Sequence, residues 1–255
     1  MKVCIFEVEE GQRAAFEGLE REHELRYFSE PLGEDNAATH ADAEVVSVFV
    51  TSELPPAVID VLGGLRLIAT RSTGFDHIDR AACEARGVVV ANVPSYGRNT
   101  VAEHAFALLL ALGRHLVDAV DRVRAGGFGR EGLRGFDLAG KTMGVIATGD
   151  IGRWMARIAR GFDMPVLAFD LAPDEALARE LGVRYVELPA LLRGSDVVSL
   201  HVPLNAGTRG ILGRDQLAMM RRGAVLLNTA RGELVDAAAL VEALHEGASA
   251  APAST

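Results

Sequence analysis

The stretch GVIATGDIGR, residues 144–153, decides the fold of the C-terminal part of the chain. An apolar strand pattern runs into Ala147-x-Gly149-x-x-Gly152, a helical pattern follows, and a second apolar strand pattern ends at Asp170. In this order a glycine turn brings helix amides to a phosphate, and an acid about 20 residues later binds the ribose hydroxyls of a dinucleotide. The stretch therefore predicts a dinucleotide site, and NAD is favoured over NADP because Asp170 repels a 2′-phosphate.

Two residues depart from the G-x-G-x-x-G pattern. Ala147 replaces the first glycine, and if the turn needs a positive φ there, its Cβ costs roughly 1 kcal/mol. Asp150 lies in the first helical turn, where its carboxylate repels a pyrophosphate by on the order of 3 kcal/mol per unit charge at about 5 Å. We expect an impaired cofactor site, unless Asp150 turns into solvent. The alternative is a tight turn that binds no ligand.

Strand and helix patterns alternate on both sides of this loop. Short apolar runs such as EVVSVFV (44–50) and DVVSLHVP (196–203) are separated by helical patterns, which indicates parallel sheets. We predict an α/β fold with two Rossmann-like or flavodoxin-like lobes and a cleft between them, a substrate domain over 1–99 and an NAD-binding domain over 100–255. Residues 100–125 are predicted to form one connecting helix about 39 Å long. A capping box of Thr100 and Glu103 is expected to open it.

Composition narrows the classes of partner. The chain has 255 residues, 49% hydrophobic and 5% aromatic, which suits buried parallel strands covered by small-residue helices. A formal charge of −9 gives no basic surface for nucleic acid or an anionic membrane. With Cys4 and Cys83 as the only cysteines, we expect no disulfide framework and no metal site. The absence of a signal-peptide or membrane-spanning pattern favours the cytoplasm.

Further motifs resemble one family. They are RSTGFDHID (71–79), NVPSYGRNTVAEHAFALLLAL (92–112), GFDLAGKTMGVIATGDIG (135–152), SDVVSLHVPLNAGTRGIL (195–212) and LLNTARGELVD (226–236). From about residue 1 to 247 the chain resembles the D-2-hydroxyacid dehydrogenases, in particular the fermentative D-lactate dehydrogenases. The resemblance implies an oxidoreductase of the EC 1.1.1 type that transfers a hydride between NAD(H) and a small 2-oxo acid, with pyruvate and D-lactate as the expected pair.

The resemblance also implies the site residues. Arg231 matches the catalytic arginine, whose guanidinium binds the substrate carboxylate and polarises the 2-oxo group. Backbone amides around Ser72, Thr73 and Gly74 are expected to hold the same carboxylate, and Tyr96 to line the substrate pocket. The implied cofactor-binding residues are Gly149, Asp150, Ile151, Gly152, Asp170, Val202, Pro203, Thr208, Thr229 and Ala230. Without the resemblance, Arg231 reads as a surface ion-pair partner and Tyr96 as a packing residue.

The family's proton donor has no match by motif. It is a histidine oriented by a glutamate, and both fall beyond the last matching residue. We therefore expect a C-terminally truncated dehydrogenase whose NAD-binding domain is incomplete and ends in the unrelated tail ASAAPAST (248–255). A catalytically impaired homologue that acts as a nucleotide-binding or interaction protein stays open as the alternative. The apolar connecting helix favours a homodimer, as in the family.

Overall fold

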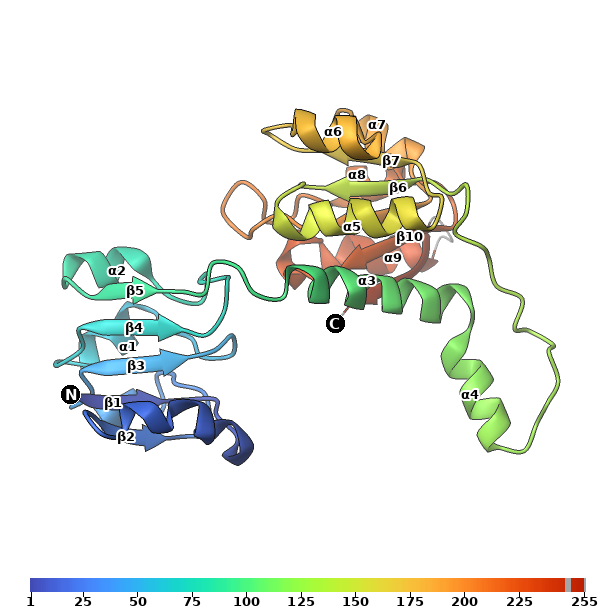
Figure 1. Ribbon diagram of the computed structural model, residues 1–255. Helices are drawn as coiled ribbons and strands as arrows, with labels where there is room; N and C mark the ends of the chain where they lie inside the picture. Colours follow the sequence, from blue (N-terminus) through green and yellow to red (C-terminus); the bar gives the residue numbers. More distant parts are fainter. Residues whose placement is uncertain (246–248, 255) are drawn as a thin grey trace. The chain divides into compact units, whose positions relative to one another are not determined.

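The structure, a computed structural model, describes residues 1–245 and 249–254 and divides the chain into two compact units. Unit 1 is Met1–Tyr96 and unit 2 is Gly97–Thr255. The domain boundary proposed from the sequence, between residues 99 and 100, lies beside this division. Each unit has its own parallel β-sheet with helices, as Figure 1 shows. The prediction of two α/β lobes with parallel sheets is confirmed.

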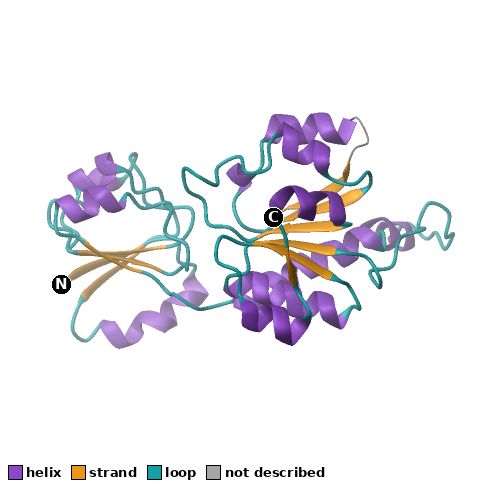
Figure 2. Ribbon diagram, turned by 90° about the horizontal axis from the view of Figure 1, so that it is seen from above, coloured by secondary structure: helices purple, strands orange, loops and turns teal. Residues whose placement is uncertain are grey.

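Unit 1 is a five-stranded parallel sheet in the order β2-β1-β3-β4-β5. Its strands are β1 (Lys2–Ile5), β2 (Glu24–Tyr27), β3 (Val45–Val48), β4 (Leu67–Thr70) and β5 (Val89–Ala91). Its helices are two 3-10 helices (Glu10–Leu19 and Ala37–His40), α1 (Pro56–Val61) and α2 (Arg80–Ala85). Figure 2 shows helices on both sides of these strands. Both faces of β1 are therefore buried, with Val3 and Ile5 in one apolar cluster and Cys4 in the other.

Unit 2 is a six-stranded parallel sheet in the order β11-β10-β9-β6-β7-β8. Its strands are β6 (Met143–Ile146), β7 (Val166–Phe169), β8 (Arg184–Tyr185), β9 (Val197–Leu200), β10 (Ala224–Asn228) and β11 (Ser249–Ser254). Its helices are α3 (Arg98–Gly113), α4 (Leu116–Arg124), α5 (Asp150–Gly161), α6 (Glu175–Leu181), α7 (Leu188–Gly194), α8 (Arg214–Met219), a 3-10 turn (Gly232–Leu234) and α9 (Ala237–His245). After β6 the chain adds β7 and β8 on one side of β6, and it then returns to add β9 on the other side. The carboxyl ends of β6 and β9 therefore form a topological switch point, where open α/β sheets bind their ligands.

The helix predicted over residues 100–125 is wrong as a single element. It is divided into α3 and α4, which are bent by 62°, and His115 between them has a left-handed φ of 50°. The helix breaks because a later segment of the chain, around Phe136, packs onto the end of α3. The amide of Phe136 donates to the carbonyl of Gly113 at 3.0 Å, and a Cβ on Gly113 would lie 3.1 Å from the Phe136 ring.

The predicted capping box is also wrong. Helix α3 begins at Arg98, after Gly97 in the left-handed conformation (φ 63°), so Thr100 lies inside the helix. The carboxylate of Glu103 accepts from the side-chain amide of Asn99 at 3.0 Å. A left-handed glycine turns the chain into the helix in place of a capping side chain.

The C-terminal tail takes part in the sheet of unit 2. Residues 249–254 form β11, which pairs in parallel with β10 at the sheet edge, with Ala224 opposite Ser249 and Asn228 opposite Ser254. The sequence distinguishes this tail as short, polar and unlike the rest of the chain, whereas in the structure its backbone adds the edge strand of the sheet. Parallel pairing uses backbone groups, so it does not require the apolar side chains of a buried strand.

Candidate active site

The cofactor-binding residues inferred from the sequence follow neighbouring strands of unit 2. The loop from Ala147 follows β6, Asp170 follows β7, Val202 lies just after β9, and Thr229 follows β10. Because these strands are parallel and adjacent, their carboxyl ends lie on one edge of the sheet. Arg231 comes from the same edge, directly after Thr229 and Ala230.

The loop between β6 and α5 forms a tight turn. Gly149 is the N-cap of α5, and a Cβ on Gly152 would overlap the carbonyl oxygen of Ala147. Among the described residues, no backbone acceptor bonds the amides of Asp150, Ile151 and Gly152. These amides are the unsatisfied donors of a helix N-terminus, which attract a phosphate group.

Ala147 adopts the conformation that glycine would favour. Its φ is 71°, and its amide donates to the carbonyl of Phe169 at 2.8 Å. The positive φ that the sequence raised as a condition is therefore present. It places a strain of roughly 1 kcal/mol in the loop, a cost that a folded domain tolerates.

The Asp170 carboxylate is anchored on this loop. Its Oδ2 accepts from the amide of Thr148 at 2.7 Å and from the Thr148 hydroxyl at 3.0 Å, and its Oδ1 accepts from the amide of Ala172 at 3.0 Å. The phenol oxygen of Tyr185 lies 2.8 Å from the same hydroxyl. Partial burial acts to raise the pKa of Asp170, but the hydrogen bonds from Ala172 and Thr148 outweigh it and hold the pKa below its ordinary value.

The sequence did not identify Thr148 and Tyr185 as parts of this arrangement. Thr148 is the second residue of the loop, and Tyr185 lies on β8, far along the chain. The only signal for Thr148 is its place in the fingerprint, and Tyr185 has none. Thr148 bonds the carboxylate and Tyr185 contacts the Thr148 hydroxyl, an arrangement that favours the charged form of Asp170, which is a strong hydrogen-bond acceptor.

Asp150 has a partner that the sequence did not suggest. Arg98, the first residue of α3, places its Nε 3.0 Å from Oδ2 of Asp150. The two side chains are 45% and 52% exposed. The carboxylate therefore faces solvent, as the sequence required for binding, and it is also paired with a cation.

The loops after β9 and β10 are held by local hydrogen bonds. The Thr208 hydroxyl donates to the carbonyl of Pro203 at 2.6 Å and accepts from the amide of Asn205 at 2.9 Å. Asn228 accepts from the amide of Ala230 at 3.1 Å, and its own side-chain amide donates to the carbonyl of Arg231 at 2.8 Å. These contacts fix the backbone on which Arg231 stands.

These residues fit a dinucleotide. The hydroxyl of Thr229 is buried and has no hydrogen-bond partner within the part of the chain that the structure describes. A buried polar atom of this kind is stabilised by a ligand group that bonds it. With the amides at the start of α5 and the close approach at Gly152, this hydroxyl gives the sheet edge hydrogen-bonding groups in the loops after β6 and β10.

The predicted substrate loop lies in unit 1, after β4. Ser72 is buried, and its hydroxyl donates to the carbonyl of Gly74 at 2.6 Å. The Thr73 hydroxyl donates to the carbonyl of Val93 at 2.9 Å, and Asn92 donates to the carbonyl of Thr73 at 2.8 Å. Among the described residues, the amides of Ser72, Thr73 and Gly74 bond no backbone acceptor. Donation from these amides to a substrate carboxylate stays a prediction.

Tyr96 is the last residue of unit 1, and its side chain is 48% exposed. This agrees with the half-buried residue that the sequence suggests without the resemblance, and a place for Tyr96 in the substrate pocket stays a prediction.

His201 ends β9 on the same sheet edge as the cofactor loop. Its Nε2 lies 2.9 Å from the hydroxyl of Ser199. Desolvation by burial lowers the pKa of His201 to about 4. The imidazole is therefore neutral at physiological pH, which agrees with the structural role expected from the sequence.

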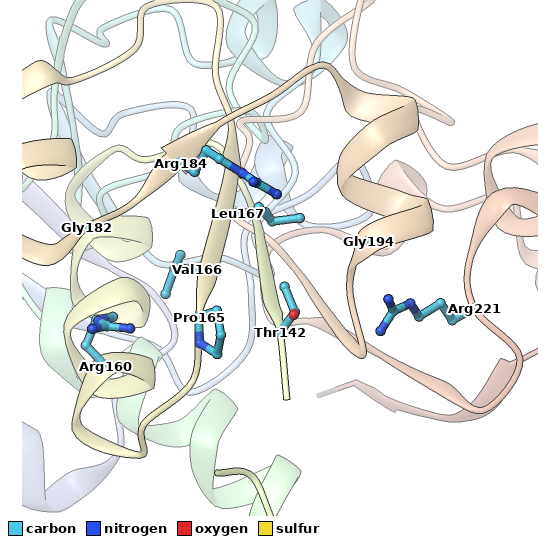
Figure 3. A pocket seen from close by; sticks show the side chains of 9 residues that line it. All are labelled: Thr142, Arg160, Pro165, Val166, Leu167, Gly182, Arg184, Gly194 and Arg221. Atoms are coloured by element: carbon cyan, nitrogen blue, oxygen red, sulfur yellow. The ribbon is translucent and has the colours of Figure 1, made fainter. Parts of the chain in front are cut away.

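A pocket lies at the opposite end of the sheet of unit 2 (Figure 3). It is lined by Thr142, Arg160, Pro165, Val166, Leu167, Gly182, Arg184, Gly194 and Arg221. Arg160, in the last turn of α5, donates to the carbonyl of Met164 at 3.2 Å, and Arg221 pairs with Asp196 at 3.0 Å. Cations at helix carboxyl ends stabilise the helix dipole, which explains the basic lining without a ligand. None of the predicted site residues lines it.

Neither a metal site nor a single membrane-spanning helix is found among the described residues. No group of three or more histidine, cysteine and acidic side chains is arranged to hold a metal ion there. No single helix of the described ranges is long and apolar enough to cross a bilayer, although α3 and α4 pass that test as a bent pair.

The geometry agrees with comparisons to known proteins. Residues 106–253 match the model of the D-isomer specific 2-hydroxyacid dehydrogenase, NAD binding domain. The chain is 43% identical over 223 residues to a D-lactate dehydrogenase of Escherichia coli K12, covering 87% of this chain and 68% of that protein. It is 39% identical over 254 residues to 2-hydroxyacid dehydrogenase A of Aspergillus oryzae, covering 97% of this chain and 73% of that protein. A crystal structure of Aquifex aeolicus D-lactate dehydrogenase complexed with NAD and lactic acid has a TM-score of 0.90 at 34% identity, covering 99% of this chain and 76% of that chain.

The matches reach further along the chain than the motifs did. The last motif ends at residue 236 and the resemblance at about residue 247, whereas the family model includes most of β11. Both the family and the cofactor implied by the sequence are confirmed. The chain therefore belongs to the D-isomer specific 2-hydroxyacid dehydrogenases, a family of NAD-dependent oxidoreductases.

Proposed function

We propose that this chain binds NAD(H) at the carboxyl edge of the sheet in unit 2 and acts on pyruvate and D-lactate. The observation that carries the proposal is the shared sheet edge, where the anchored carboxylate of Asp170 and the guanidinium of Arg231 follow strands of one sheet. The carboxylate is suited to bind the ribose of the cofactor, and the arginine is suited to bind the carboxylate of a 2-oxo acid. The names of the Escherichia coli and Aquifex relatives support D-lactate as the hydroxy acid.

Each part of the cofactor has candidate partners. The amides of Asp150 and Ile151 would hold the pyrophosphate, and Asp170 the adenosine ribose. The remaining proposed contacts are Gly149 and Gly152 in the turn, Val202, Pro203 and Thr208 on the adenosine side, and Thr229 and Ala230 at the nicotinamide end. Asp170 favours NAD over NADP, because its charge repels a 2′-phosphate.

For the substrate, Arg231 would bind the carboxylate through two parallel N–H bonds and polarise the neighbouring 2-oxo group. Ser72, Thr73 and Gly74 would add backbone donors to the same carboxylate, and Tyr96 would contact the substrate. The bound cofactor supplies or accepts the hydride at C2. No histidine of the chain matches the family's proton donor by motif, so binding and turnover are tested separately.

The test is calorimetric titration of the whole chain with NADH, followed by an NADH-linked pyruvate assay. Binding of NADH and turnover of pyruvate support the proposal. Binding of oxamate, an unreactive pyruvate analogue, only when NADH is present supports the substrate site independently of turnover. A chain that binds neither NADH nor oxamate contradicts it.

A second candidate function is nucleotide binding without turnover. The missing match to the family's proton donor favours it, because turnover needs that donor. The strained Ala147 and the acidic Asp150 also distinguish the loop from that of an efficient dehydrogenase, since both weaken a pyrophosphate site. In the same assay this function gives NADH binding with no oxidation of NADH by pyruvate, glyoxylate or other 2-oxo acids.

We also propose that the chain forms a homodimer through α4. No residue of α4 is buried, and Leu116, Val117, Val120 and Val123 are exposed. An amphipathic helix with an uncovered apolar face is stabilised by a partner surface. A second copy is the occupant that a symmetric interface needs.

A further inference from the structure

Arg98 and Asp150 form an ion pair at the first residue of α5. The shortest contact of the pair is made by Nε of the guanidinium, and no hydrogen bond involves Nη1 or Nη2 of Arg98 among the described residues. An arginine carries five N–H donors in a planar fork, so one edge can hold a carboxylate while the other holds a second anion. The Nη donors of Arg98 can therefore bind a second anion.

The position of Arg98 is fixed by packing. Gly97 turns the chain in the left-handed conformation, and α3 starts at the next residue. Helix α3 packs beside α5 (Figure 1). The rings of Phe106 and Phe162 stack between them at 5.5 Å between centroids. The Arg98–Asp150 contact shows that the two helices begin beside each other, so both N-termini direct their positive dipole ends to the same place.

The charges around this place are unbalanced without Arg98. The pyrophosphate of a dinucleotide carries two negative charges, and Asp150 adds a third in the turn whose amides would bind it. Arg153, on the next turn of α5, is already paired with Asp174. Arg98 is therefore the cation that the described geometry supplies to the loop.

We propose that Arg98 is a pyrophosphate-binding residue of this chain, which holds Asp150 through Nε and the cofactor's pyrophosphate through Nη. The inference rests on the proposed function, because it concerns the same NAD(H) site. It explains how an acidic residue is tolerated in the phosphate loop. The carboxylate serves as the anchor that orients the guanidinium, and the guanidinium offsets the carboxylate's charge.

The experiment measures dissociation constants of NADH and of adenosine, which has no phosphate, for the whole chain. Replacing Arg98 by Gln is expected to weaken NADH binding roughly 30-fold, and Asp150→Asn to strengthen it several-fold, on the order of 5-fold. Adenosine binding is expected to stay unchanged in both variants. The control is Arg157→Gln, since Arg157 is an exposed arginine of the same helix that stacks on Trp154, and it should leave NADH binding unchanged.

The double variant separates contact with the phosphate from simple neutralisation of Asp150. If Arg98 bonds the pyrophosphate, Arg98→Gln in the Asp150→Asn background still weakens NADH binding roughly tenfold. If the double variant binds NADH as tightly as Asp150→Asn alone, the inference is overturned. Arg98→Lys keeps the positive charge but lacks the planar fork of donors, so its NADH affinity is expected to lie between those of the wild type and Arg98→Gln. This variant tests the inference if Arg98→Gln does not fold.

Different results would overturn the proposed NAD(H)-binding function and the proposed role of Arg98. A wild-type chain that does not bind NADH overturns the proposed function and this inference with it. A wild-type chain that binds NADH as tightly as a folded Arg98→Gln variant overturns the role of Arg98 and leaves the proposed function standing. Melting curves of each variant establish that the compared chains are folded.

Discussion

The amide of Thr148 donates to the carboxylate of Asp170 at 2.7 Å, across the ends of two neighbouring parallel strands. The Thr148 hydroxyl adds a second bond to the same oxygen and lies within hydrogen-bond distance of Tyr185. The acid is thereby held on the phosphate loop before any ligand arrives. Preorganised charge of this kind lowers the ordering cost of binding.

Asp170→Asn is expected to weaken NADH binding about tenfold, because the amide is a poorer acceptor for ribose hydroxyls than the carboxylate. The same change is expected to narrow the preference for NADH over NADPH, since the charge that repels a 2′-phosphate is lost. Dissociation constants of both cofactors measure these effects. Asp137→Asn is the control, because that side chain is 85% exposed and pairs only with Arg114 among the described residues. An unchanged cofactor preference in Asp170→Asn would contradict the assigned role.

Ala147→Gly is expected to leave the free energy of unfolding unchanged or raise it by up to about 1 kcal/mol. Glycine removes the Cβ strain at φ 71°, which opposes the greater freedom of glycine in the unfolded chain. Ala178→Gly, inside α6, is the matched control and should lower the same free energy by about 1 kcal/mol. Urea unfolding measures both. Equal losses in the two variants would show that Ala147 is not strained.

His201 is expected to give a pH dependence of stability with a defined sign. Its pKa in the folded chain is about 4, below the ordinary 6.5, so the unfolded chain binds more protons between these values. Above pH 6.5 the imidazole is neutral in both the folded and the unfolded chain, so it does not affect the free energy of unfolding. As the pH drops from 6.5 toward 4, protonation of the unfolded chain lowers that free energy. NMR titration of the imidazole signals checks this, with the signal assigned by its absence in His201→Gln. A His201 midpoint near pH 6.5 would refute the prediction.

Val120→Asp is expected to convert a dimer of this chain into a monomer, because it places a charge in the exposed apolar face of α4. Light scattering after size exclusion measures the mass. Asp118→Asn, on the same helix, is the control and should leave the mass unchanged, since Asp118 is a 68% exposed side chain beside His115. A wild-type chain that is monomeric at tens of micromolar would remove the basis for the dimer.

The sequence by itself determined the fold class, the family and the strand–loop–helix unit around Gly149. These follow from short-range patterns, in which alternating apolar runs and a glycine turn fix the local backbone with little help from the rest of the chain. It also identified Ala147 and Asp150 as departures and gave the condition for each. The structure met both conditions, with a positive φ at Ala147 and an exposed carboxylate at Asp150.

Only the tertiary structure decided the pairs that join distant residues. Tyr185 meets Thr148 through the sheet order, Arg98 meets Asp150 through the packing of α3 on α5, and the predicted long helix breaks where Phe136 packs on Gly113. The tail pairs with β10 through its backbone. Local propensity carries no record of such partners, because they depend on which elements the folded core brings together.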